Sequence, residues 1–356
     1  MKEILDMINS IEPLDASRDD DIQKHLDNLT KPPGSLGRLE EIAKTFIRAS
    51  SVYPPKINRK TIFVMAADHG VAAEGVSAFP AEVTPQMVQN FLNGGAAINV
   101  LARHTGCETR VVDMGVNADF GDLKSLIDRK VARGTKNIAE GPAMTEDEMI
   151  RAMKSGIELA GTAAGEGTDI IGTGDMGIAN TTASTAVYCA LLGLEPEEIT
   201  GAGTGLDEEG VRLKTEVIKR ALEKNAPYGN PLDVLMKLGG FEIAGLAGLI
   251  IGAAKNGLPV VVDGFISGAA AAVAMKICPN VSERLLFAHL SDEKGHKTVL
   301  EKLCIKPILD FNMRLGEGTG AALAISVIEA AVKIYNEMAT FESAGVSDSV
   351  EIAPSV

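Results

Sequence analysis

Hydrophobic positions follow two alternating patterns from about residue 61 onward. Short runs rich in β-branched residues predict strands, and longer runs with helical spacing predict helices between them. The predicted strands are Thr61–Ala66, Glu108–Asp113, Thr168–Ile171, Leu258–Val262 and Arg284–Leu290, with a weaker one at Glu198–Gly201. The predicted helices are Pro85–His104, Thr145–Ala164, Ala183–Leu192, Val211–Asn225, Gly240–Lys255 and Gly268–Ile277. This alternation predicts an α/β fold whose parallel strands are joined by right-handed crossovers.

Both ends of the chain have the pattern of helices alone. The terminal helices are expected at Glu3–Ile11, Ser17–Asn28, Leu39–Ala49 and Ala321–Met338. Between the second and third of them, Pro32-Pro33-Gly34 must break the helix. We interpret the segment from Lys31 to Arg38 as a rigid loop. The alternative is that Lys31 or Arg38 reaches a phosphate.

Composition narrows the class of protein. A chain of 356 residues exceeds the usual size of one domain, and its hydrophobic content of 46% is ample for a core. The net charge of −14 argues against nucleic acid or an anionic membrane as the main partner, although a small anionic substrate is still compatible with it. The most apolar stretch, 241–262, is broken by charged residues and a proline, which favours a buried helix and strand over a membrane span.

Cysteine and histidine spacing gives no sign of a metal site. The four cysteines form no C-x-x-C pair and the five histidines no H-x-x-x-H pair, so we expect reduced thiols and no structural zinc. The first residues are charged and amphipathic, unlike a signal peptide. A cytoplasmic protein is therefore expected.

Polar residues, mostly beside glycine, follow five of the predicted strands. They are Asp68-His69-Gly70, Asp113-Met114-Gly115, the segment 172–177, Asp263-Gly264 and His289-Leu290-Ser291. In an open parallel sheet, ligands bind in the crevice outside the carboxyl ends of the strands. We therefore expect a ligand crevice there. Asp68-His69 itself suits acid–base work or a metal, or a histidine that is merely hydrogen-bonded.

The segment Gly172–Gly177 matches G-x-G-x-x-G between a predicted strand and a helix start. Bare glycines and a helix N-terminus make an anion cradle, so we favour the phosphate of a mononucleotide. A dinucleotide is less well supported, since the motif lies in mid-chain and the segment twenty residues later resembles a turn. The alternative function is an NAD-binding oxidoreductase that uses Gly172–Gly177. A tight turn without a ligand also fits the pattern.

A second glycine cluster, Gly201–Leu206, lacks the lysine of a P-loop. With Thr181, Thr182 and Lys214 it would complete a phosphate site, and otherwise it is a flexible connection. The loop from Ser77 to Met87 contains an aromatic residue and a methionine. It suits the lining of a flat apolar pocket, or is an ordinary packed loop.

Glu317 lies between two glycines, directly before the long apolar helix at 321–338. Glycines let a ligand approach the backbone closely, and the helix start favours an ionised carboxylate. Glu317 is therefore placed like a general base beside a substrate pocket. The structural alternative is an acidic first-turn residue in a glycine-rich helix entry. A purely structural scaffold is disfavoured by this glutamate together with the five polar strand ends.

Several segments, in order along nearly the whole chain, resemble the nicotinate-nucleotide–dimethylbenzimidazole phosphoribosyltransferase family. They are Lys31–Glu40, Ala67–Val71, Val131–Ala139, Gly141–Met144, Gly177–Thr182, Leu258–Phe265 and Arg314–Ala322. The resemblance implies a Rossmann-like parallel sheet domain, 59–324, and a small helical domain formed by 1–58 and 325–356. It also implies a homodimer with no required metal or other cofactor.

The activity implied by the resemblance is transfer of phosphoribose from nicotinate mononucleotide to a benzimidazole nitrogen, with inversion at C1′. The product is α-ribazole 5′-phosphate, which supplies the lower ligand of cobalamin. Glu317 matches the family's catalytic base. The other implied substrate-binding residues are Asp175, Met176, Gly177, Gly203, Thr204, Lys214, Asp263, Ser291, Phe79, Met87, Leu315 and Gly316.

Within that set, the resemblance assigns parts of the substrates. Gly177, Gly203, Thr204 and Lys214 would hold the phosphate, Asp263 and Ser291 would lie near the ribose and nicotinate, and Phe79, Met87, Met176 and Leu315 would line the benzimidazole pocket. The chain departs from the family pattern at a few positions. Asp175 stands where the family often has Glu, Phe79 and Met87 replace more polar residues, and 203–210 lacks a proline.

Overall fold

A computed structural model describes residues 1–347 of the chain. The strands are β1 (Lys60–Ala67), β2 (Glu108–Gly115), β3 (Leu126–Asp128), β4 (Ile170–Met176), β5 (Val260–Val262), β6 (Leu285–Phe287), β7 (His289–Leu290) and β8 (Leu309–Asp310). The helices up to β5 are α1 (Lys2–Asn9), α2 (Asp19–Asp27), α3 (Arg38–Ala49), η1 (Gly70–Glu74), α4 (Val83–Leu92), α5 (Ala97–Thr105), α6 (Glu146–Gly165), α7 (Asn180–Leu192), α8 (Pro196–Ile199), α9 (Glu208–Asn225), α10 (Pro231–Leu238) and α11 (Phe241–Lys255). After β5 come α12 (Phe265–Ile277), η2 (Pro279–Arg284), α13 (His296–Lys302), α14 (Thr319–Glu337) and α15 (Phe341–Ala344).

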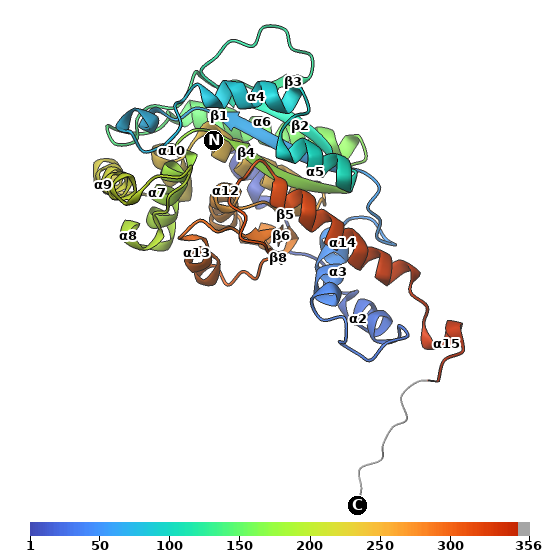
Figure 1. The fold of residues 1–356 in the computed structure, drawn as a ribbon. Coiled ribbons are helices and arrows are strands. Elements are labelled where there is room, and N and C mark those ends of the chain that lie inside the picture. Colours follow the sequence, from blue (N-terminus) through green and yellow to red (C-terminus); the bar gives the residue numbers. More distant parts are fainter. Residues whose placement is uncertain (348–356) are drawn as a thin grey trace, which may run out of the picture.

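Six parallel strands form the central sheet, in the order β3-β2-β1-β4-β5-β6 (Figure 1). This is the strand order of a doubly wound Rossmann-type sheet, with its topological switch between β1 and β4. Every residue of β1 is buried, because helices cover both faces of the sheet. The predicted fold class, a Rossmann-like α/β fold with a parallel sheet flanked by helices, is confirmed.

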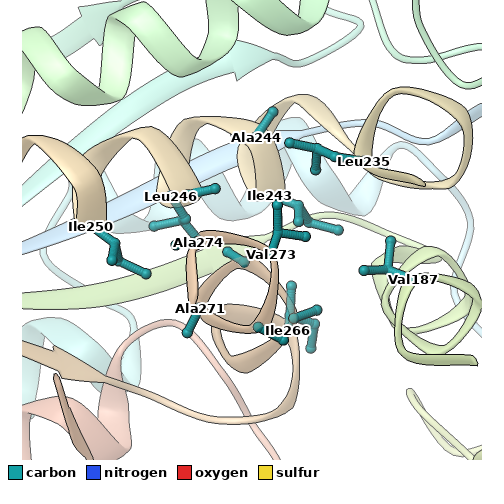
Figure 2. Packing of buried hydrophobic residues seen from close by; sticks show 14 of the residues in the cluster. Val187, Leu235, Ile243, Ala244, Leu246, Ile250, Ile266, Ala271, Val273 and Ala274 are labelled. Carbon is teal, nitrogen blue, oxygen red and sulfur yellow. The ribbon is translucent and has the colours of Figure 1, made fainter. Parts of the chain in front are cut away.

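The two faces of the sheet pack against different helices. Phe63 and Met65 of β1 belong to a core cluster with apolar residues of α6, α7, α10, α11 and α12, whereas Ile62 and Val64 belong to a cluster with α3, α5 and α14. Figure 2 shows the first cluster from close by, with Ile243, Leu246 and Ile250 of α11 near Ala271 and Ala274 of α12. The alternation of side chains along β1 thus divides the core into two layers.

Glycines allow α6 and α11 to pack unusually closely. A Cβ on Gly156 of α6 would overlap the carbonyl oxygen of Gly245, and a Cβ on Gly248 of α11 would overlap that of Met153. A Cβ on Gly252 would lie 2.8 Å from the Cα of Ile157. The backbones of the two helices are therefore in direct contact, and each glycine fills a place that a larger residue cannot occupy.

The terminal helices α3 and α14 cover part of one face of the sheet, and α14 continues past it. Figure 1 shows α14 running from the sheet toward α2, α3 and α15, and Leu29 forms an antiparallel bridge with Thr340. The helix α1 differs, because its Ile4 and Ile8 belong to the cluster with α11 and α12. The division into 59–324 and a small helical domain of 1–58 plus 325–356 stays a prediction, and its last residues, 348–356, lie outside those that the structure describes.

Three elements differ from the sequence-based expectation. The single helix predicted at Pro85–His104 is wrong, because Gly94 adopts a positive φ of 75° and separates α4 from α5. The weak strand predicted at Glu198–Gly201 is also wrong, since Pro196 starts the short helix α8 there. The strand predicted at Arg284–Leu290 is divided, and β7 pairs with β8 in a separate two-stranded sheet.

Within residues 1–347, none of the helices is long and apolar enough to cross a membrane.

The glycine contact between α6 and α11 predicts opposite effects for two alanine substitutions on one helix. Gly156→Ala should destabilise the protein by about 1–3 kcal/mol, because the new Cβ meets the backbone of α11. Gly161→Ala on the same helix should stabilise it by up to about 1 kcal/mol, since nothing lies within 4 Å of the new Cβ. Urea denaturation of both variants measures this, and equal effects would contradict the packing argument.

Candidate active site

A cavity of about 260 Å³ lies at the carboxyl ends of the central strands. Its lining comes from the end of β4, from the segments that follow β4, β5 and β6, and from the loop after η1. The loop at 201–206 and the turn before α14 complete it. The lining residues are Phe79, Asp175, Met176, Gly177, Ile178, Asn180, Thr181, Gly203, Thr204, Gly264, Phe265, Ile266, His289, Ser291, Glu293, Arg314, Leu315 and Gly316. The predicted crevice therefore exists beside the switch point of the sheet, at three of the five polar segments, and the segments after β1 and β2 do not line it.

The segment Gly172–Gly177 is not a strand-to-helix loop. Its first five residues form most of β4 and pair with β1, so the dinucleotide interpretation of the motif, and with it the NAD-binding alternative, loses its structural basis. Gly174 is bare for another reason, since a Cβ there would lie 2.6 Å from the backbone oxygen of Glu317. The glycine lets the turn before α14 lie directly on the strand.

The start of α7 forms one side of the cavity. Gly177 packs on the carbonyl oxygen of Ala67, and Ala179 takes a left-handed conformation, with φ of 72°, just before the helix. Asn180 and Thr181 then line the cavity from the first turn of a 13-residue helix. A helix N-terminus with unpaired N–H groups favours a negatively charged ligand.

Lys214 of α9 lies buried beneath the second glycine cluster. Its ammonium group donates to Thr181 Oγ1 at 2.8 Å and to the carbonyl oxygen of Gly201 at 3.2 Å. A Cβ on Gly203 would lie 3.0 Å from this ammonium group, so the glycine leaves room for it. Burial lowers the pKa of Lys214 to about 8, although the nearby Glu293 carboxylate acts in the opposite direction. The predicted phosphate residues Gly177, Gly203 and Lys214 are thus brought together.

Asp175 lies at the bottom of the cavity and is almost completely buried. Its carboxylate accepts hydrogen bonds from Asn180 Nδ2 at 3.0 Å and Ser267 Oγ at 3.4 Å. Burial raises its pKa well above the usual range, and the carboxylates of Asp263, Glu242 and Glu317 add to the effect. Asp175 is therefore suited to a neutral, hydrogen-bonding role.

Glu317 precedes α14 with a positive φ of 62°, and its carboxylate is turned toward a different helix. Oε2 accepts from the backbone N–H of Ile98 at 3.4 Å, in the first turn of α5. The expectation that the start of α14 would itself favour this charge is wrong, because Asp263 occupies that position. Burial raises the pKa of Glu317, the Ile98 N–H lowers it, and the charge of Asp263 raises it further. The residue does not line the cavity, but the adjacent Gly316 does.

Asp263 follows β5 and caps α14. Its carboxylate accepts from the N–H of Gly318 at 3.1 Å and from that of Ala321 at 2.9 Å. Burial raises its pKa, while the His289 side chain and the backbone N–H groups of α14 lower it. Asp263 is 1% exposed and lies behind the lining, whereas Ser291, its expected neighbour at the ribose, lines the cavity.

The apolar part of the lining contains three of the four residues predicted for a flat base. Phe79, Met176 and Leu315 line the cavity, and Phe79 and Leu315 are 52% and 57% exposed. Met87 lies on α4, packed half-buried against the core cluster and outside the lining. The structure therefore does not bring Met87 to the cavity with the other three.

Sequence reasoning missed three side chains around this site. Arg314 donates to the carbonyl oxygen of Gly203 at 2.9 Å, and Glu293 accepts from the N–H of Gly203 at 3.3 Å. His296 has a pKa lowered by burial to about 3 and accepts from the N–H of Ser291 at 2.8 Å. Arg314 stands next to the recognised Leu315-Gly316-Glu317 segment, which was the available signal. Glu293 and His296 had none beyond their nearness to Ser291.

Three other candidates, Lys31, Arg38 and His69, do not line the cavity. Lys31 forms a buried ion pair with Glu40 at 2.9 Å, and Arg38 donates to the carbonyl oxygen of Lys306, so the rigid-loop interpretation holds. His69 is buried and forms a 2.6 Å hydrogen bond with Glu242, as expected for a hydrogen-bonded histidine. Among residues 1–347, no group of three or more His, Cys, Asp or Glu side chains is placed to hold a metal ion.

Comparison with known proteins agrees with this architecture. The profile of a family described as "Phosphoribosyltransferase" matches residues 11–346. The nicotinate-nucleotide–dimethylbenzimidazole phosphoribosyltransferase of Chlorobaculum tepidum is 58% identical over 96% of this chain and 97% of its own length, and that of Geobacter metallireducens is 54% identical over 96% and 98%. The crystal structure of CobT from Thermus thermophilus superposes with a TM-score of 0.88 at 45% identity, covering 98% of this chain and all of that one. The resemblance found in the sequence is thereby confirmed, and the chain belongs to the nicotinate-nucleotide–dimethylbenzimidazole phosphoribosyltransferase family.

Proposed function

We propose that this enzyme transfers the phosphoribosyl group of nicotinate mononucleotide to 5,6-dimethylbenzimidazole. The products are nicotinate and α-ribazole 5′-phosphate, the precursor of the lower ligand of cobalamin. One observation carries the proposal: a single cavity is lined by Thr181 and Gly203, which contact or adjoin the buried ammonium group of Lys214, and by the apolar side chains of Phe79, Met176 and Leu315, while Glu317 follows the lining residue Gly316. The homodimer and the cytoplasmic location stay predictions.

The phosphate end is supported by charge. The chain carries a net charge of −14, so an anionic substrate needs a local cation. Lys214 supplies that cation, and the start of α7 adds the positive end of a helix dipole. Gly203 leaves space for a phosphate to come close to the ammonium group. The phosphate would compete with Thr181 Oγ1 for the lysine.

The chemistry needs little acid catalysis at the leaving group. In nicotinate mononucleotide the pyridinium nitrogen is bonded to C1′. When this bond breaks, the nitrogen keeps the electron pair, so nicotinate leaves with an uncharged ring and needs no protonation. Positive charge develops on the ribose as that bond breaks, and a nearby carboxylate stabilises it. The incoming benzimidazole nitrogen approaches the opposite face, which gives inversion at C1′. Positioning of the two flat rings on either side of the ribose supplies much of the acceleration.

Glu317 is the general base in this mechanism. As one ring nitrogen attacks C1′, the other must lose its proton, and the carboxylate of Glu317 takes it. Burial raises its pKa, so the carboxylate accepts a proton more readily than an exposed glutamate does. Its single, long hydrogen bond to Ile98 leaves the group able to turn toward a bound base. Asp175, by contrast, is held in place by hydrogen bonds from Asn180 and Ser267.

Glu317→Gln should lower kcat by roughly 10²- to 10⁴-fold, because the amide cannot accept the proton. Turnover is measured by chromatography of α-ribazole phosphate and nicotinate. Glu337→Gln, at the exposed far end of the same helix, is the matched control and should keep full activity. A loss of less than about tenfold in the Glu317 variant would remove this residue from the role of base.

We expect kcat/KM for nicotinate mononucleotide to fall as the pH rises through about 8, because Lys214 loses its charge in that range. Burial lowers its pKa to about 8, and a lysine is charged only below its pKa. Since kcat/KM reports groups of the free enzyme, the basic limb should appear near that value. In Lys214→Arg the limb should vanish, because a guanidinium stays protonated. A limb unchanged in that variant would show that another group titrates.

A further inference from the structure

The segment Ser77–Phe79 forms a wall beside the cavity, and its last residue, Phe79, lines the cavity. All three residues also line an adjoining cavity of about 710 Å³, which shares Phe79 with the first. The adjoining cavity is bounded by residues that follow β1 and β2, among them Asp68 and Asn117. The Phe79 side chain is 52% exposed, so it is not held by core packing. Hydrogen bonds must therefore fix the position of this wall.

Those hydrogen bonds converge on Thr204, more than 120 residues away in the chain. Thr204 Oγ1 accepts from the N–H of Ala78 at 3.1 Å and pairs with Ser77 Oγ at 3.1 Å. Ser77 Oγ in turn accepts from the N–H of Phe79 at 3.2 Å. Every residue of the wall is thus linked to one hydroxyl group, directly or through Ser77.

Thr204 can hold the wall because its own loop is anchored at several points. The N–H of Gly203 donates to Glu293, and its carbonyl oxygen accepts from Arg314. The carbonyl oxygen of Gly201 accepts from Lys214, the cation of the anion site. The loop therefore connects the phosphate side of the cavity with the wall that carries Phe79.

We infer that Thr204 is a positioning residue that holds the Ser77–Phe79 wall and thereby sets the size of the acceptor base that the cavity admits. This inference rests on the proposed transfer to a benzimidazole. It differs from the role expected from the sequence, in which Thr204 contacts the phosphate. When the hydroxyl is removed, the wall is free to move into the adjoining cavity, and the acceptor side of the site widens. The phosphate side keeps Lys214, Gly203 and α7.

The test is a steady-state comparison of Thr204→Val, which is nearly isosteric, with Thr204→Ser, which keeps the hydroxyl. In the valine variant, KM for dimethylbenzimidazole should rise about three- to tenfold, as expected for the loss of exposed hydrogen bonds, and KM for nicotinate mononucleotide should stay within about twofold. Discrimination in kcat/KM against a benzimidazole with one further fused aromatic ring should fall several-fold. Thr204→Ser should restore all three values.

Two more variants separate this role from a general loss of structure. Ser77→Ala should shift KM for the base in the same direction, and the double variant with Thr204→Val should be no worse than the more impaired single one. Thr162→Val, an exposed threonine on α6, is the matched control and should change neither KM. Thermal unfolding of each variant checks that the fold is intact.

The inference is overturned if KM for the nucleotide rises while KM for the base does not, since Thr204 would then act on the phosphate. It is also overturned if base selectivity is unchanged in Thr204→Val. Failure of the proposed function is a separate result, because the unaltered enzyme would then release no nicotinate with any base. In that case calorimetric titration of both proteins with the two bases still compares the sizes that the wall admits.

Discussion

The site depends on a buried carboxylate that joins two parts of the chain. Asp263, at the end of β5, accepts from two backbone N–H groups at the start of α14 and so fixes the turn from Gly316 to Gly318. The absence of a side chain on Gly174 lets this turn lie on β4, beside the switch point of the sheet. Glu317 is held in a left-handed conformation between these contacts. Strain of this kind persists only where the surroundings determine the backbone, and here the sheet and the cap do so.

Four carboxyl groups share this small volume, and their mutual effect orders the chemistry. Asp175, Asp263 and Glu317 all have raised pKa values, and Asp263 contributes to those of the other two. The fourth group, Glu242, forms a short hydrogen bond with His69. Those of the carboxyl groups that are ionised repel an anion and attract positive charge. Lys214 contacts the first turn of α7 at Thr181, and Asn180 of the same turn contacts Asp175, so the cation and the acids meet at this helix start.

The sequence was sufficient for the parallel sheet, the crevice at the polar strand ends and the family, because those inferences depend on local patterns. The partners of the polar groups were not predictable in the same way. Asp263 was expected at the ribose and caps a helix 55 residues later, since such contacts are decided by the packing of distant elements. The glycines of G-x-G-x-x-G were interpreted as a bare loop for a ligand, but Gly172 and Gly174 lie within β4 and admit α14 and its preceding turn. The inference that another group comes close to these glycines was correct, but at Gly172 and Gly174 that group is α14 and its preceding turn.

The helix α14 has 19 residues, which makes it a rod of about 28 Å. One end is clamped at the turn that holds Glu317, and the other lies among α2, α3 and α15 (Figure 1). Because a helix is stiff along its axis, a tilt of the terminal helices would displace the turn at the other end of the rod. The helix α14 thus connects residues that lie outside the cavity lining, those of α2, α3 and α15, with the turn that contains the lining residue Gly316.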